Sequence, residues 1–240
     1  MDALILAGGR GTRLASVVAD RAKPVAQVAG RPFLALLLAH IARCSDVERV
    51  VLCVGHKAES VETALGRGFG RLELVYSREK APLGTGGALR HALRAFAPRA
   101  PVLVFNGDTM FPMGLRRFLA FHRAERPAAS MALARVVDAS RFGTVRMRDT
   151  RVAGFAEKGS SGPGWVNAGT YVLGKEAIAS LLSGPAAFSL ERDALPAWCE
   201  AGTLAGLRSR ARFLDIGVPE DYARAAALFA PRGIQSGEGP

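Results

Sequence analysis

The chain is 240 residues long, and 49% of its residues are hydrophobic while 22% are charged. This balance is typical of one folded domain with a full-sized core and excludes a disordered chain. No apolar run approaches the roughly 18 residues that a transmembrane helix needs, so we expect no membrane partner. Cys44, Cys53 and Cys199 have unrelated spacings and indicate reduced thiols; without a signal segment, they predict a cytoplasmic protein.

The formal net charge is +11, and most of the positive residues are arginines scattered along the chain. Aromatic residues make up 7% of the chain, and no motif of a nucleic-acid-binding domain is present. A solvated basic surface that attracts small phosphorylated ligands therefore explains the charge better than a nucleic acid partner. Nucleic-acid binding stays open as an alternative that rests on charge alone.

The first part of the chain alternates short apolar runs with helical patterns. In chain order we expect a strand at 3–7, a helix at 33–44, strand 50–54, helix 58–65, strand 72–76, helix 86–96, strand 102–105 and helix 114–126. This order predicts a parallel sheet with helices on both faces.

The second part is less regular. We expect strands at 130–136, 144–147, 152–156 and 165–173, and helices at 176–182, 190–201 and 219–229. No linker divides the chain, so we predict one domain over residues 1–232 with two lobes, about 1–110 and 111–232. The small, polar residues 233–240 predict a flexible tail.

The loop Gly8–Arg13, which reads GGRGTR, follows the first predicted strand. Its three glycines let the backbone approach phosphates closely, and Arg10 and Arg13 add bidentate phosphate donors. Leu14 stands where the dinucleotide fingerprint has its third glycine, and the Walker lysine is missing. Taken alone, the loop is compatible with a phosphate site and with a structural turn.

Two acidic residues follow apolar runs. Asp108 ends the segment VLVFNGD, and a carboxylate at the carboxyl end of a buried strand lies where a metal-bound triphosphate would sit. Asp215, in FLDIG, is its natural partner. Lys23, fixed by Pro24, would project back over the loop. An Asx-Gly turn and a surface lysine are the structural alternatives.

Eight segments in this order resemble the nucleotidyltransferases that make nucleotide-sugars: LAGGRGTRL (6–14), KP (23–24), PLGTGGAL (82–89), NGD (106–108), FGTV (142–145), EK (157–158), NAGTYVL (167–173) and DIGVPEDY (215–222). With FSLERD (188–193), they are most similar to the D-glycero-α-D-manno-heptose 1-phosphate guanylyltransferase branch. Mannose 1-phosphate guanylyltransferases and sugar 1-phosphate uridylyltransferases are close relatives. The resemblance implies a Rossmann-like, glycosyltransferase-A-like three-layer α/β sandwich, with a mixed, mostly parallel central sheet, a nucleotide-binding first lobe and a smaller sugar-binding second lobe.

The resemblance also implies the reaction and its residues. A sugar 1-phosphate would attack the α-phosphorus of GTP or another nucleoside triphosphate, and pyrophosphate would leave. Arg13, Lys23, Asp108 and Lys158 would be catalytic, with Mg²⁺ held by Asp108 and Asp215. The implied nucleotide-binding residues are Leu6, Ala7, Gly8, Gly9, Arg10, Gly11, Thr12, Arg13, Lys23, Glu79, Pro82, Gly84, Thr85, Asn106, Gly107 and Asp108. The implied sugar-phosphate-binding residues are Gly143, Glu157, Lys158, Asn167, Gly169 and Glu191.

The resemblance implies that Glu79 and Gly84 are base-binding positions. A carboxylate at Glu79 would accept from guanine N1–H and N2–H₂ together, a pairing that adenine does not offer, whereas uracil offers a single N3–H. We therefore expect guanine, with uracil left open, and a GDP-heptose for capsule or other surface polysaccharide. An exposed loop charge is the alternative at Glu79.

Other readings of these residues remain. The pair Glu157-Lys158 is also compatible with a surface ion pair, and Glu191 with a helix-surface charge. A non-catalytic nucleotide-sugar sensor is a remote alternative, because such a protein would lose the metal acids or the loop arginine. A homodimer is compatible with the sequence, which does not decide the oligomeric state.

Overall fold

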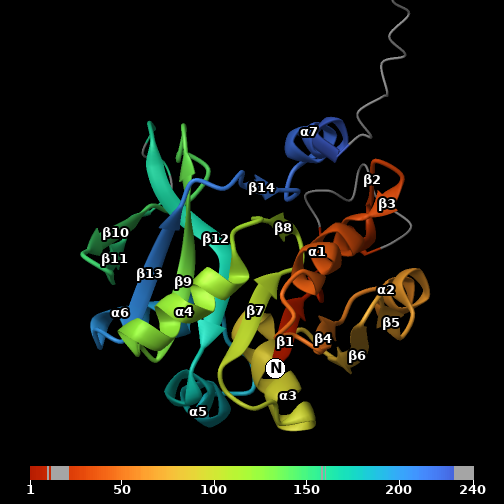
Figure 1. Ribbon diagram of the computed structural model, residues 1–240, viewed down its shortest axis with the longest axis horizontal. Helices are drawn as coiled ribbons and strands as arrows, with labels where there is room; N and C mark the ends of the chain where they lie inside the picture. Colours follow the sequence, from red (N-terminus) through yellow and green to blue (C-terminus); the bar gives the residue numbers. More distant parts are fainter. Residues whose placement is uncertain (10, 12–21, 158, 160, 230–240) are drawn as a thin grey trace, which may run out of the picture.

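The computed structural model describes the whole chain except residues 10, 12–21, 158, 160 and 230–240. A mixed sheet of ten strands runs through the molecule in the order β10-β11-β13-β9-β12-β7-β1-β4-β6-β5 (Figure 1). Helices pack against both of its faces. The predicted Rossmann-like α/β fold is confirmed.

Four neighbouring parallel strands form the first half of the sheet: β7 (Val102–Asn106), β1 (Asp2–Leu6), β4 (Arg49–Val54) and β6 (Leu72–Arg78). Leu6 at the end of β1 is paired with a neighbour on each side, so the strands finish at one edge of the sheet. Loops that follow parallel strands therefore converge there.

Both faces of these strands are covered, which explains their uninterrupted apolar sequences. Side chains alternate along a strand, so Ala3 and Ile5 enter one core while Leu4 enters the other. The first core includes residues of α1 (Phe33–Ala42), α2 (Ala58–Leu65), α4 (Leu115–Glu125) and α7 (Pro219–Phe229). The second includes residues of α3 (Gly84–Phe96), α5 (Lys175–Ser183) and α6 (Leu195–Glu200).

The second half of the sheet is centred on β12 (Gly164–Leu173), which runs antiparallel to β7 and to β9 (Ala129–Val136). On the far side of β9, β13 (Leu204–Ser209) runs parallel to it. The hairpin of β10 (Val145–Arg148) and β11 (Arg151–Phe155) completes this end.

Several short elements were not predicted, because two residues carry no periodicity. They are β2 (Gln27–Val28), β3 (Arg31–Pro32), β5 (Gly68–Phe69), β8 (Thr109–Met110) and β14 (Leu214–Asp215). The helix predicted over 190–201 is also divided, into a π-helical turn at Leu190–Ala194 and α6. Pro196 lies near the start of α6, where its missing N–H costs no regular helical hydrogen bond.

Cys44 and Cys53 are buried free thiols, as expected, whereas Cys199 is half-buried. Within the described parts of the chain, no helix has the length and apolar character needed to cross a membrane.

Acid is expected to destabilise the fold through His40 in α1, whose Nε2 is buried without a hydrogen-bond partner among the described residues. Burial, and secondarily the charge of Arg43, lowers the pKa of His40 from 6.5 to about 4. The folded pKa lies below the unfolded one, so this contribution is complete above pH 6.5 and is lost as the pH falls to about 4. The unfolding free energy should drop by up to about 3 kcal/mol through this group. Denaturant unfolding between pH 6.5 and 4 should show that the unfolding free energy of a His40→Leu variant depends less on pH than that of the native protein. An equal pH dependence in the two proteins would contradict the role of His40.

Candidate active site

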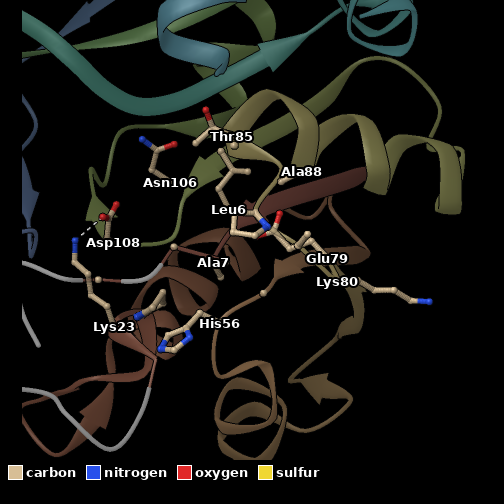
Figure 2. A pocket seen from close by; sticks show the side chains of 18 residues that line it. Leu6, Ala7, Lys23, His56, Glu79, Lys80, Thr85, Ala88, Asn106 and Asp108 are labelled. Carbon is tan, nitrogen blue, oxygen red and sulfur yellow. Dashed lines mark hydrogen bonds and ion pairs between the residues drawn. The ribbon is translucent and has the colours of Figure 1, made fainter. Parts of the chain in front are cut away.

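A cavity of about 590 Å³ opens where β1, β4, β6 and β7 end (Figure 2). The residues that line it include twelve that the sequence assigned to the nucleotide: Leu6, Ala7, Gly8, Gly9, Gly11, Lys23, Glu79, Pro82, Gly84, Thr85, Asn106 and Asp108. Gly107 is not among them; its N–H donates to Leu6 O (2.9 Å), which ties β7 to β1. Arg10, Thr12 and Arg13 lie outside the described residues.

An ion pair stands at one side of the cavity. Lys23 Nζ lies 2.6 Å from Asp108 Oδ2, and the two side chains are 12% and 38% exposed. Lys23 begins a short 3₁₀ turn, and the Ala22 N–H before it donates to Ser60 Oγ (3.0 Å). The turn therefore directs Lys23 towards Asp108, just beyond the end of β7.

Asp215 comes to the same place through a strand pair that the sequence did not reveal. In the pairing of β8 with β14, Asp215 lies opposite Thr109, and Ile216 N–H donates to Asp108 O (3.0 Å). Burial raises the pKa of Asp215; the charge of Asp108 also raises it, while Lys23 lowers it. The two carboxylates are therefore electrostatic neighbours, although Asp215 does not line the cavity itself.

These two carboxylates fit Mg²⁺, which binds one or two carboxylates and takes its other ligands from phosphate oxygens and water. Asp215 Oδ1 accepts from Gly217 N–H (2.6 Å), which orients the carboxylate and leaves Oδ2 for a ligand. No set of three or more histidine, cysteine or acidic side chains in the described regions is arranged to hold a metal, so the protein alone does not form a closed metal cage.

Glu79 closes the opposite side of the cavity. Its N–H donates to Val54 O (2.9 Å), and its Oε2 accepts from Leu83 N–H (3.3 Å). Burial raises the pKa of this half-buried carboxyl group, against the effects of the Leu83 hydrogen bond and of His91. The neighbouring Arg78 pairs with Glu59 and Glu62, and the ammonium group of Lys80, which also lines the cavity, is directed away from Glu79 (Figure 2). Glu79 is a cavity-wall carboxylate with no ion-pair partner in the described structure.

Thr85 and Glu191 are 106 residues apart in the sequence, and the fold joins them. Thr85 Oγ1 donates to Glu191 Oε2 (2.5 Å) and accepts from Leu190 N–H (2.8 Å). Gly84 allows this approach, because its φ is +72° and a Cβ would lie 2.4 Å from Phe188 O. The first turn of α3 and the π-helical turn therefore form one unit, and Glu191 is not a free surface charge.

The described residues assigned to the sugar, Glu191 included, are not among those that line the cavity. Asn167 Oδ1 accepts from Gly169 N–H (3.0 Å), and Nδ2 donates to the Tyr171 hydroxyl (2.7 Å), so its polar groups stabilise the irregular part of β12. Gly169 has φ +65° and packs on Asn106, where a Cβ would be 3.0 Å away. Gly143 packs beneath Ala156 O. Glu157 is exposed, and Lys158 lies outside the described residues.

Sequence reasoning missed two kinds of residue. Gly55 and His56 line the cavity, and Gly55 directly follows the apolar strand β4, just as the predicted loop follows β1. That position was a usable signal. Tyr171 is fully buried, which raises its pKa, and its hydroxyl accepts a hydrogen bond from Asn167 Nδ2. No sequence signal distinguishes this tyrosine from an ordinary strand residue.

Comparison with known proteins agrees with this geometry. A family model described as nucleotidyl transferase matches residues 2–231. The chain belongs to the nucleotidyl transferase family. It is therefore an enzyme, and the cavity at the strand ends is its candidate active site.

Individual relatives are similar over nearly the whole chain. The D-glycero-α-D-manno-heptose 1-phosphate guanylyltransferase of Aneurinibacillus thermoaerophilus is 38% identical and covers 94% of this chain and 96% of its own length. The mannose-1-phosphate guanylyltransferase of Mycobacterium tuberculosis is 35% identical over 98% of this chain, which spans 66% of that protein. The crystal structure of HddC from Yersinia pseudotuberculosis complexed with GMP-PN has a TM-score of 0.83 and 33% identity, covering 95% of this chain and 99% of that one.

The Tyr171 hydroxyl is expected to stabilise the site through its amide partner. Tyr171→Phe would leave the Asn167 Nδ2–H group without its acceptor and should lower the unfolding free energy by about 1–3 kcal/mol. Tyr76→Phe is the matched control, because it also removes one tyrosine hydroxyl, which bonds Gly66 O away from the site. Denaturant unfolding measures stability, and turnover should fall only in the Tyr171 variant. Unchanged stability and turnover would contradict this role.

Proposed function

We propose that the enzyme transfers GMP from GTP to D-glycero-α-D-manno-heptose 1-phosphate. The observation that carries the proposal is the half-buried Glu79 carboxylate in the cavity wall, which has no ion-pair partner in the described structure. A buried carboxylate is costly unless donors satisfy it, and the adjacent N1–H and N2–H₂ groups of guanine supply two. The Aneurinibacillus relative is named as a heptose 1-phosphate guanylyltransferase, and the Yersinia structure is a complex with GMP-PN. Both support guanine as the base.

In the proposed reaction, an oxygen of the sugar 1-phosphate forms a bond to the α-phosphorus of GTP. The bond between that phosphorus and the α–β bridging oxygen breaks, so GDP-heptose forms and pyrophosphate leaves. No side-chain nucleophile is needed, since such a transfer depends on alignment and neutralised charge. We propose that the backbone around Gly8, Gly9 and Gly11 surrounds the triphosphate, with Arg13 holding the departing pyrophosphate.

Lys23 lines the cavity beside Asp108. It pairs with Asp108 at 2.6 Å, and we propose that it also neutralises the reacting phosphates. Asp108 and Asp215 would hold Mg²⁺, which when bound neutralises negative charge on the phosphate oxygens. Asp108 then orients both Lys23 and the metal side of the site.

The acceptor sugar is placed beside β12. We propose that Lys158 binds its phosphate and that Gly143, Glu157 and Asn167 position the sugar, with Gly169 shaping that wall. Glu191, fixed by Thr85, would face between nucleotide and sugar. Mannose 1-phosphate is the second candidate acceptor, because the Mycobacterium tuberculosis relative named for that activity is 35% identical.

We place the reaction in the cytoplasm, where GTP and sugar phosphates occur, and its product in the synthesis of capsule or another surface polysaccharide. Residues 1–232 would act as one domain, as a monomer or homodimer.

A substrate panel tests the proposed function. GTP and UTP are each combined with heptose 1-phosphate and mannose 1-phosphate, and pyrophosphate release is measured. GTP with the heptose acceptor should give the highest kcat/KM. Preference for UTP would contradict the guanine assignment, and preference for mannose 1-phosphate would select the second candidate.

Asp108→Asn is expected to lower turnover at least about 100-fold, because it removes a charge that orients both Lys23 and Mg²⁺. Asp149→Asn is a suitable control; Asp149 is exposed, and its left-handed backbone (φ 53°) suits asparagine. Circular dichroism should show both variants folded. Retained turnover in Asp108→Asn would remove Asp108 from the site.

A further inference from the structure

The Glu79 side chain lies across the ends of two other strands. The hydrogen bond from Glu79 N–H to Val54 O continues the pairing of β6 with β4, which places Glu79 beside Gly55. His56 N–H in turn donates to Gly8 O (3.4 Å), so the residues that follow β4 and β1 are also joined. The carboxylate lies against Gly55 and Gly8, and all three residues line the cavity.

The space beneath this carboxylate exists only because residues 8 and 55 lack side chains. A Cβ on Gly55 would lie 2.5 Å from Glu79 Oε1, 2.8 Å from Cγ and 3.0 Å from Cδ. A Cβ on Gly8 would lie 3.0 Å from the same Oε1. Optimal contacts between non-bonded heavy atoms are about 3.5–4.0 Å, so an alanine at position 55 and this Glu79 conformation exclude each other.

Backbone conformation does not explain these glycines. Gly8 and Gly55 are not among the described glycines with positive φ, in contrast to Gly11 and Gly84. Neither has the left-handed φ that favours glycine. Gly55 provides room for Glu79, and Gly8 provides room both for Glu79 Oε1 and for the backbone of Val54 and Gly55, which a Cβ would approach to 3.4 and 3.2 Å.

The Glu79 carboxylate is held in one orientation and has hydrogen-bond acceptor capacity left over. Leu83 N–H binds Oε2, which fixes one oxygen, while Oε1 rests on the two glycines. Of the charged residues on either side of it, Arg78 pairs with Glu59 and Glu62, and the ammonium group of Lys80 is directed away from Glu79 (Figure 2). A base with two adjacent N–H donors would supply the hydrogen bonds that this carboxylate lacks.

We propose that Gly55, together with Gly8, determines base specificity by forming a glycine floor that holds the Glu79 carboxylate in the position that accepts two donors from guanine. The inference rests on the proposed GTP specificity and adds to it a positioning residue that acts through Glu79. A substitution at position 55 should displace a flexible side chain and not the backbone, so the fold should survive while base selectivity is lost.

The test compares kcat/KM for GTP and for UTP, with the same sugar 1-phosphate, in the native protein and in Gly55→Ala. A guanine contact by a paired acceptor is worth roughly tenfold to 100-fold in discrimination, so the GTP-to-UTP ratio should fall by about tenfold or more. Gly68→Ala is the matched control, because Gly68 lies on edge strand β5 and a Cβ there meets only Leu72 O, at 3.8 Å. Its ratio should equal that of the native protein.

A double-mutant cycle separates action through Glu79 from a general disturbance. Glu79→Gln alone should lower the GTP-to-UTP ratio. In the double variant, Gly55→Ala should cause little further loss of that ratio. Additive losses would overturn the inference. An unchanged GTP-to-UTP ratio in Gly55→Ala would overturn the inference, whichever base the native protein prefers. If the native protein prefers UTP, the proposed function is refuted, but the change of the ratio in Gly55→Ala still tests the role of Gly55.

Folding is checked separately. If Gly55→Ala alone does not fold, Gly55→Ala/Glu79→Ala, which removes the contacted atoms, is expected to fold. Failure of both would overturn the inference, because the added Cβ would then be excluded by something other than Glu79.

Discussion

The parallel register of β1 with its neighbours is the constraint on which the site depends. Leu6 is paired with Cys53 on one side and with Asn106 on the other, so the segments after β1, β4, β6 and β7 begin at one edge of the sheet. Hydrogen bonds between these segments, such as Gly107 N–H to Leu6 O, extend the alignment beyond the strands. Residues distant in sequence thereby face one cavity.

Charge is distributed unevenly around that cavity. The chain as a whole carries +11, yet burial raises the pKa of two carboxyl groups at the site, Glu79 and Asp215. Burying a carboxylate without full compensation costs stability, and folded proteins accept that cost where a ligand completes the interaction. In the proposed function, Glu79 binds the base and Asp215 binds the metal.

The sugar side follows a different logic. Two residues assigned to the sugar are held by internal hydrogen bonds: Asn167 donates to the Tyr171 hydroxyl, and Thr85 donates to Glu191. Such networks fix wall positions before substrate arrives, which favours alignment of the reacting phosphates. The irregular pairing of β12 with β9 makes room for this network beside β7.

The sequence by itself determined the alternation of elements, the α/β class and the family. It also assigned a set of residues to the nucleotide, and the described members of that set line one cavity, except Gly107. Those features are local, since short motifs directly follow apolar strands. Tertiary structure alone decided the β8–β14 pairing that brings Asp215 to Asp108, the Tyr171 network, and the place of Gly55 beneath Glu79. Each of these depends on contacts between distant segments, and a two-residue strand or the space left by a missing Cβ produces no pattern in the sequence.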